Sequence, residues 1–278
     1  MSVISGVGGA VNTISTVRTW RINSEADLQA FVASNTKAGT GRLAGNKDWN
    51  GQYTAYGHTP IKMPGEAFAF VGNMSNGKGA SGTAIVDSVE IVWDIEAGAP
   101  IAHTVSFSGN GALTLGAAAA ADESVLTVLS SIGTKVELAP VLATPVYIEL
   151  LDIRTITLTI TASNQSYVSS STAGETKRTE GNIDATLAIS VYSDDFTLAP
   201  FPVVNDARHV RLFIDDTLFW DIDWMRFGEN SDIEVDLEGP SNVGVTLNAS
   251  FSAFEDIDTV LIEGFIKKPA GSTFWPKP

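Results

Sequence analysis

Much of the chain alternates between apolar and polar residues with a period of two. In VEIVWDIE (89–96) the apolar residues at 89, 91, 93 and 95 are set against Glu90, Asp94 and Glu96. This alternation is typical of a β-strand with one face in the core and one face in water. Similar runs, rich in β-branched and aromatic residues, predict strands in both halves of the chain: 67–71, 84–96, 101–107, 153–161, 183–192, 209–214, 218–227, 232–238 and 243–251.

Two segments have a helical pattern instead. Residues 24–34 (SEADLQAFVAS) begin with a serine cap and bring Leu28, Phe31 and Val32 to one face of a helix. Residues 122–133 (DESVLTVLSSIG) begin with an aspartate cap, carry an apolar stripe and end at a glycine. With so few helices available as crossovers, we expect a mainly β fold, antiparallel, with sandwiches or partly closed barrels and short helices.

The sequence also repeats itself. The skeleton R-x-x-G-N-x-D occurs at 42–48 and at 178–184, an offset of 178 − 42 = 136, and at that offset residues 17–57 and 153–193 share thirteen identities in forty-one positions without a gap. The identities include the pairs Arg18 and Arg154, Arg42 and Arg178, Asp48 and Asp184, and Tyr56 and Tyr192. Further on, VSFSG (105–109) matches VDLEG (235–239) at an offset of 130. We therefore interpret the chain as two copies of one module.

The repeat sets the expected domain boundaries. Residues 1–16 are an extended or flexible N-terminal arm, 17–115 a first β domain and 116–150 a linker with a short helix. Residues 151–266 are a second β domain, and 267–278 form a proline-rich C-terminal extension. In each copy we expect the Gly–Asn pair to shape a turn that precedes a strand.

Composition narrows the possible partners. Asp and Glu number 32 against 17 Lys and Arg, a formal charge of −15, so the surface should repel nucleic-acid phosphates and anionic membranes. There is no cysteine, which excludes disulfides and thiolate metal sites and is compatible with a reducing cytoplasm. The N-terminus has no basic segment followed by an apolar run, and no stretch reaches the ~18 apolar residues of a membrane span. We expect neither export nor membrane insertion.

Candidate catalytic chemistry is weak. His58, His103 and His209 have no close spacing to one another or to a nucleophile, so we expect structural or surface roles for them. Residues 72–78 match G-x-x-x-x-G-K, but Gly79 stands where a phosphate-binding loop needs Ser or Thr, and a hairpin loop is favoured. Paired acids could serve a glycosidase, yet acids that alternate with apolar residues are typical of a sheet with one wet face. We expect no enzyme activity, no cofactor and no metal.

The duplication and several strand motifs resemble the tail tube proteins of long-tailed bacteriophages. The motifs are RLAGNKDWNGQYTAYG, AIVDSVEIVWDIEAG, IAHTVSFSGNGALT, FWDIDW and DIEVDLEG, and the resemblance covers about residues 17–266. It implies tandem tube-type domains whose sheets join those of neighbouring subunits into a closed inner barrel. Single-domain members form hexameric rings, so a duplicated chain resembles the variant in which three copies form a pseudo-sixfold ring. Stacked rings make the tail of the virion, which is assembled in the host cytoplasm.

The resemblance also implies roles and partners. The partners are further copies of the chain, other tail proteins such as tape measure, terminator and distal tail proteins, and DNA that passes without specific binding. Candidate interface residues are Arg18, Arg154, Arg42, Arg178, Asp48 and Asp184, with turn capping inside each module as the alternative. Candidates for an acidic channel or wet face are Glu90, Asp94, Glu96, Asp221, Asp223, Glu234, Asp236 and Glu238. A capsid decoration or adhesion protein of a virion is the alternative function, because it would also be β-rich, repeated and acidic.

Overall fold

A computed structural model places much of the chain in one antiparallel sheet. It describes residues 2–7, 16–33, 39–57, 60, 62–73, 78–117, 128–140, 146–193, 207–213, 219–234, 241–249 and 266–267. The fold is mainly β, as the alternating pattern predicts, and the one described helix is a short 3-10 turn, η2 (Ser170–Thr172). Fourteen described strands belong to a single sheet, and two more form a small separate ribbon.

The strands follow the chain in two sets. The N-terminal set is β1 (Ser2–Val7), β2 (Val17–Phe31), β3 (Gly41–Tyr56), β4 (Ala67–Asn73), β5 (Lys78–Asp94) and β6 (Ala102–Ala117). The remaining strands are β7 (Val136–Pro140), β8 (Ile148–Leu150), β9 (Ile153–Ala162), β10 (Gln165–Tyr167), β11 (Lys177–Thr179), β12 (Ile183–Ser193), β13 (Ala207–Phe213), β14 (Phe219–Glu234), β15 (Ser241–Ala249) and β16 (Ile266–Lys267).

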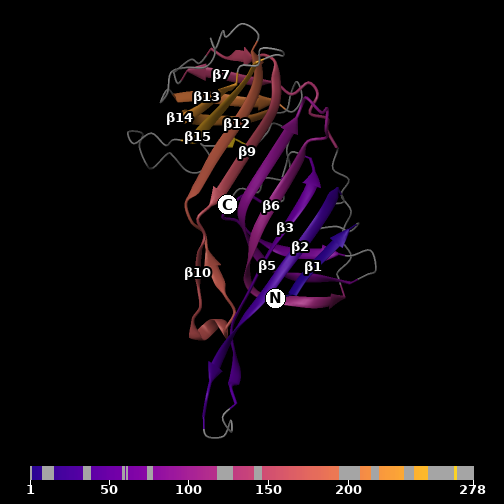
Figure 1. Cartoon of the computed structure of the whole chain (residues 1–278), viewed down its shortest axis with the longest axis vertical. Helices are drawn as coiled ribbons and strands as arrows, with labels where there is room; N and C mark the ends of the chain where they lie inside the picture. The colour runs from indigo at the N-terminus through magenta and orange to yellow at the C-terminus, as the bar shows by residue number, and fades with distance from the viewer. Residues whose placement is uncertain are drawn as a thin grey trace.

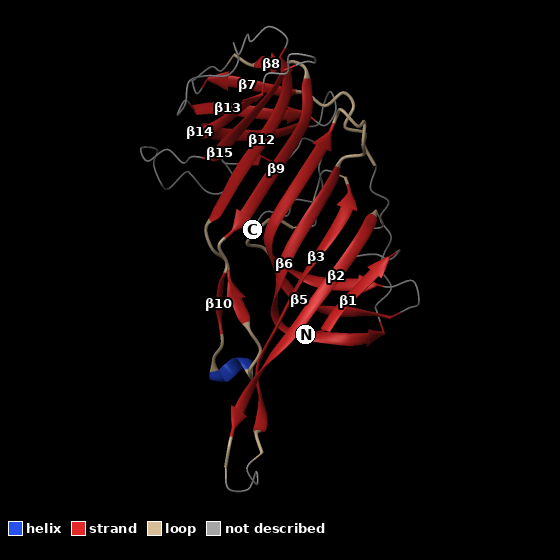
Figure 2. Ribbon diagram, viewed as in Figure 1, coloured by secondary structure: helices blue, strands red, loops and turns tan. Residues whose placement is uncertain are grey.

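The sheet is continuous through both halves of the chain and strongly curved (Figure 1). Its strand order is β1-β2-β3-β6-β5-β9-β12-β15-β14-β13-β7-β8, with β4 beside β5 and β16 beside β14. The β2–β3 hairpin extends beyond the sheet as a long ribbon, and the β10–β11 ribbon runs alongside it (Figure 2). Buried residues of both halves form one connected core, so the structure joins the two halves edge to edge.

One face of the sheet is apolar and buried. In the N-terminal half the β4–β5 hairpin contributes Phe70, which packs on Phe107 of β6 with ring centroids 4.9 Å apart and on Trp20 of β2 at 6.1 Å. In the C-terminal half the fully buried side chains include Leu158, Leu187 and Trp220. Aromatic and branched side chains of this size supply most of the apolar area that a sheet can bury.

The opposite face is polar and rich in hydroxyl groups. Its residues follow from the strand registers: Arg21, Asn23, Asn50, Gln52, Thr54, Thr104, Ser106, Ser88, Glu90, Thr155, Thr157, Thr159, Thr161, Asp184, Thr186 and Ser190. The buried and less buried positions alternate along β5 and β9, as a strand with two unlike faces requires. Asp94 also lies on this face, opposite Thr155. Glu90, Asp94 and Asp184 therefore place carboxylates among residues that are mostly neutral.

Several local predictions are wrong. Residues 24–31, predicted as helix, belong to strand β2. Leu28 and Phe31 in this strand, and Val32 directly after it, are exposed and do not form a buried helix face. Pairing with β3 satisfies the backbone there and overrides the helical spacing. Of the predicted helix 122–133, residues 122–127 lie outside the described residues and 128–133 are not helical. The predicted linker contributes β7 and β8, which extend the sheet beside β13.

Candidate assembly site: the joint between the two repeats

The internal repeat is visible in the strand pairing itself. In the β2–β3 hairpin Trp20 faces Tyr53, and in the β9–β12 hairpin Ile156 faces Ile189, an offset of 136 on both strands. Both ladders shift register at the same place, because the extra residue is Arg18 in β2 and Arg154 in β9. A β-bulge of this kind redirects a side chain and bends the strand. The two arginines of the sequence repeat are thus equivalent in structure.

The Gly–Asn pair of the repeat marks a second shared bulge. Ala26 pairs with Lys47 while Leu28 pairs with Ala44, so β3 carries an extra residue at Gly45–Asn46. In the second half the register shifts in the same way between the pairs 162–183 and 165–179. A side chain at either glycine would press on the opposite strand, at Asp27 for Gly45 and at Ser163 for Gly181. In the first repeat the predicted turn before a strand is therefore wrong, because Gly45 and Asn46 lie inside β3 at a bulge that glycine permits. In the second repeat Gly181 and Asn182 come directly before β12.

The remaining strands repeat at offsets that differ from the one expected. Tyr56 pairs with Ala102 and Tyr192 with Asn242, which gives β6 and β15 an offset of 242 − 102 = 140. Likewise Val89 pairs with Val105 and Ser231 with Val245, so this part of β5 and β14 has an offset of 231 − 89 = 142. The match of 105–109 with 235–239 at an offset of 130 is thereby corrected. We call β2–β6 the first repeat and β9–β15, with η2, the second repeat.

The two repeats meet where β5 pairs with β9, and we call this region the joint. Seven residue pairs join the strands, from Ser88 with Thr161 to Asp94 with Thr155. Val89, Ile91 and Trp93 point to the core and are fully buried, as the alternation predicts. At one end of the joint Asn164 donates hydrogen bonds to the Val86 carbonyl at 2.9 Å and to Asp87 Oδ1 at 2.8 Å.

At the other end of the joint a charged cluster spans the two repeats. Arg154 donates to Glu96 Oε2 from Nε at 2.9 Å and from Nη2 at 2.7 Å, and its guanidinium lies over the Tyr192 ring, 4.5 Å from the centroid. Tyr192 donates its hydroxyl to Glu96 Oε1 at 2.9 Å. The hydrogen bonds from Arg154, and then that from Tyr192, lower the pKa of Glu96. The same hydrogen bonds with Glu96 raise the pKa of Arg154 and of the Tyr192 hydroxyl.

A second charged contact links the two ribbons. Arg178 of β11 binds Asp48 of β3 in a bidentate pair, with N–O distances of 2.9 and 2.6 Å, and also donates to the Gly109 carbonyl. The Arg178 side chain is 12% exposed and that of Asp48 is 30% exposed. Lys47 pairs with Glu175 at 3.3 Å, and its backbone bonds to residues 174 and 176 in parallel. These contacts hold the ribbons together with directional, charge-assisted hydrogen bonds.

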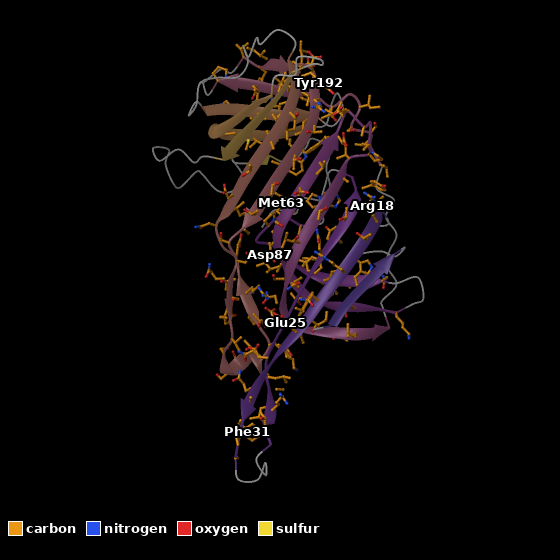
Figure 3. The ribbon with its side chains drawn as sticks, viewed as in Figure 1. Arg18, Glu25, Phe31, Met63, Asp87 and Tyr192 are labelled. Atoms are coloured by element: carbon orange, nitrogen blue, oxygen red, sulfur yellow. The ribbon has the colours of Figure 1, made fainter. Side chains whose placement is uncertain are left out.

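The predicted interface residues thus divide into two groups. Arg154, Arg178 and Asp48 meet partners across the joint, whereas Arg18, Arg42 and Asp184 occupy the equivalent places away from it and are exposed. Arg18 lies over its own repeat's Tyr56 at 5.1 Å, as Arg154 does over Tyr192. Within the described part of the chain, none of these three exposed residues forms a salt bridge. Figure 3 shows Arg18 and Tyr192 far apart on the sheet.

The predicted acidic residues lie in different environments. Glu90 is exposed on the polar face at the joint, and Asp94 ends β5 and accepts the Ala97 N–H at 3.0 Å. Glu96 follows in a turn and belongs to the charged cluster. The sequence pattern did not predict this role, although the recurrence of Tyr56 as Tyr192 had marked one member of the cluster. Asp221, Asp223 and Glu234 belong to β14. Asp236 and Glu238 lie outside the described residues.

Other candidate chemistry is not assembled by the fold. His103 is fully buried in β6, where its Nδ1 is 2.8 Å from the Gly57 carbonyl, and His209 is half-buried in β13. His58 lies outside the described residues, and Gly72 and Lys78 belong to the β4–β5 hairpin. The described residues include no group of three or more metal-binding side chains. Among them no helix is long and apolar enough to cross a membrane.

Comparison with known proteins adds no family. The sequence matches no family model and no curated protein. The geometry of the joint is therefore the basis for a functional assignment.

Proposed function

We propose that the chain is a structural subunit of a bacteriophage tail tube, with two tandem tube-type domains that correspond to the two repeats. The observation that carries the proposal is the joint. In the sheet order β5 is the outermost strand of the first repeat and pairs with β9, the first strand of the second repeat, and the sheet continues with the same polar face. Repetition of such a head-to-tail contact between identical chains generates a ring when the rotation closes. A closed ring also removes sheet edges, which otherwise promote aggregation.

Three chains would supply six repeats, and the polar face would line the channel. Its side chains are mostly threonine, serine and amides, with the carboxylates of Glu90, Asp94 and Asp184 among them. Neutral hydroxyls offer phosphates no strong binding site, and the net charge of −15 repels them over a Debye length of ~8 Å. This surface suits the passage of DNA without specific binding.

The long ribbon supports stacking of rings into a tube. Phe31 lies close to the tip of the β2–β3 ribbon (Figure 3), and Leu28, Val32 and Leu43 near it are 63%, 71% and 61% exposed. Exposed apolar side chains on a protruding element are typical of a surface that packs against another subunit. We assign this ribbon to contacts with the adjacent ring, and the ends of the tube to contacts with other tail proteins of the virion.

Electron microscopy of the purified chain tests the proposal. We expect rings with a central hole, three chains in each ring by mass measurement, and stacks of rings at higher protein concentration. A compact trimer without a hole would favour the capsid decoration alternative. A chain that stays monomeric at all concentrations and ionic strengths would contradict both.

A further inference from the structure

The N-terminal strand occupies a position that the repeat assigns to another strand. β1 pairs antiparallel with β2, and Val3 faces Asn23. At the joint Glu90 of β5 faces Thr159 of β9, and Thr159 is the counterpart of Asn23, since 159 − 23 = 136. β1 therefore lies on the first strand of the first repeat as β5 lies on the first strand of the second.

The strand that corresponds to β5 in the second repeat is β14, and one edge of its residues 231–234 has no partner among the described strands. Residues 231–234 of β14 pair with β15 as residues 89–92 of β5 pair with β6. On its other side β5 pairs with β9 along residues 88–94. Among the described strands, residues 231–234 pair with β15 alone. In the described part of the chain, one edge of the repeat array is thus covered by β1, and the corresponding edge at 231–234 is unpaired.

The two residues of the ion pair between the ribbons each have a counterpart in the other repeat. Asp48 of the first repeat binds Arg178 of the second. The equivalent residues are Asp184 in the second repeat and Arg42 in the first, and both are exposed. A second copy placed by the geometry of the joint would bring its Arg42 to Asp184. Asp184 and Arg42 carry opposite charges, as this contact between two copies requires.

We propose that β1 holds the place of a second copy's β14, and that subunits join when β14 displaces β1 from the edge of β2. The offsets of 142 and 136 set the register: Asp232 of one copy faces Asn23 of the next, as Glu90 faces Thr159 inside the chain. This inference rests on the proposed ring and adds to it the interface, its register and a strand exchange.

The exchange costs little in hydrogen bonding. In the register of the joint, residues 231–234 of β14 would pair with residues 21–24 of β2 and replace the backbone hydrogen bonds that β1 makes there, as an added strand does at a sheet edge. The additional Asp184–Arg42 contact then favours the intermolecular strand. Until a neighbour arrives, β1 protects the β2 edge from pairing at random. The arm therefore slows incorrect pairing without preventing correct assembly.

A disulfide lock tests the exchange, because the chain contains no cysteine of its own. In Val3→Cys/Asn23→Cys the two cysteines face each other across β1 and β2, at a separation that suits a disulfide. We expect the oxidised variant to lose ring formation and to recover it on reduction. The control Thr159→Cys/Thr186→Cys links β9 to β12 within the second repeat and should form rings in both states.

A second pair tests the register. Asn23→Cys/Asp232→Cys should form disulfides between chains in assembled rings, seen as trimers on a non-reducing gel. The control Asn23→Cys/Ile233→Cys is shifted by one residue, which turns the second cysteine to the opposite face of the sheet, and should not cross-link.

The outcomes separate this inference from the proposed function. Rings formed by the oxidised lock would overturn the strand exchange, and rings without a 23–232 cross-link would overturn the register, while the tube function stands. A wild-type chain that forms no rings would overturn the proposed function, and this inference with it.

Discussion

Asp48 and Arg178 bind each other where the two repeats meet, whereas Asp184 of β12 and Arg42 of β3, the same positions in the other repeat, are exposed. The same contrast holds for Arg154, which binds Glu96, and for Arg18, which stacks on Tyr56 alone among the described residues. The same charged residues thus occur in both repeats, and among the described residues each forms an ion pair in only one of the two repeats. One set of these charges is paired within the chain and the equivalent set is exposed, an arrangement that supports the proposed head-to-tail contact.

The two repeats differ most in their ribbons. The first repeat continues its hairpin as two unbroken strands, whereas the second breaks into β10, η2 and β11. The broken ribbon folds against the first at Lys47, where the backbone of residues 174–176 pairs with β3. One ribbon therefore supports the joint, while the tip of the other remains exposed for further contacts.

Substitution of Gly181 should lower the unfolding free energy more than substitution of Gly45, and the loss at Gly181 is the largest effect that we expect. In Gly181→Ala the new methyl group would overlap the carbonyl oxygen of Ser163, whereas in Gly45→Ala it would lie 3.0 Å from Asp27. We expect Gly181→Ala to cost about 3 kcal/mol of unfolding free energy and Gly45→Ala about 1 kcal/mol. Urea denaturation of the two variants measures the difference. Equal costs would mean that the two bulges are equally able to relax.

The alternation of apolar and polar residues predicted the buried face of the strands but not the alignment of the two repeats. Alternation correctly predicted the buried residues 89, 91 and 93, because a strand with one wet face leaves a local pattern. The same pattern could not give the offset between the copies beyond Tyr56. A period of two is unchanged by any even shift, so 130 and 140 fit the alternation equally well.

Long-range pairing explains the other misses. Residues 24–31 have the spacing of a helix, and only the partner strand 41–48 shows that the backbone is extended there. The poor helix formers in the equivalent segment 160–170 were the available signal. The contact between Asp48 and Arg178 joins residues 130 positions apart and depends on how one repeat meets the next. Neither charge carries that information locally, although their recurrence marked both as candidates.

The paired and exposed aspartates should differ in the isolated chain. Asp48→Asn leaves the mostly buried Arg178 without its carboxylate, so we expect a loss of about 2 kcal/mol in unfolding free energy. Asp184→Asn should cost less than about 0.5 kcal/mol, since Asp184 is exposed. Chemical denaturation of the monomer measures both. In the assembled ring we expect Asp184→Asn to weaken the contact between chains, because Asp184 is proposed to bind Arg42 of the next copy. A ring that tolerates Asp184→Lys would argue against that contact.

The smallest effect is the response of the Glu96 cluster to pH. Because Arg154 and Tyr192 lower the pKa of Glu96 in the folded chain, its contribution to stability is complete above the unfolded pKa and is lost as the pH falls through the folded pKa. Wild type and Glu96→Gln should therefore differ in thermal stability near neutral pH and converge in acid. Glu90→Gln is the matched control for loss of an exposed carboxylate on the polar face. A gap between wild type and Glu96→Gln that stays constant into acid would show that the cluster contributes through packing of Tyr192 on Arg154 and not through the Glu96 charge.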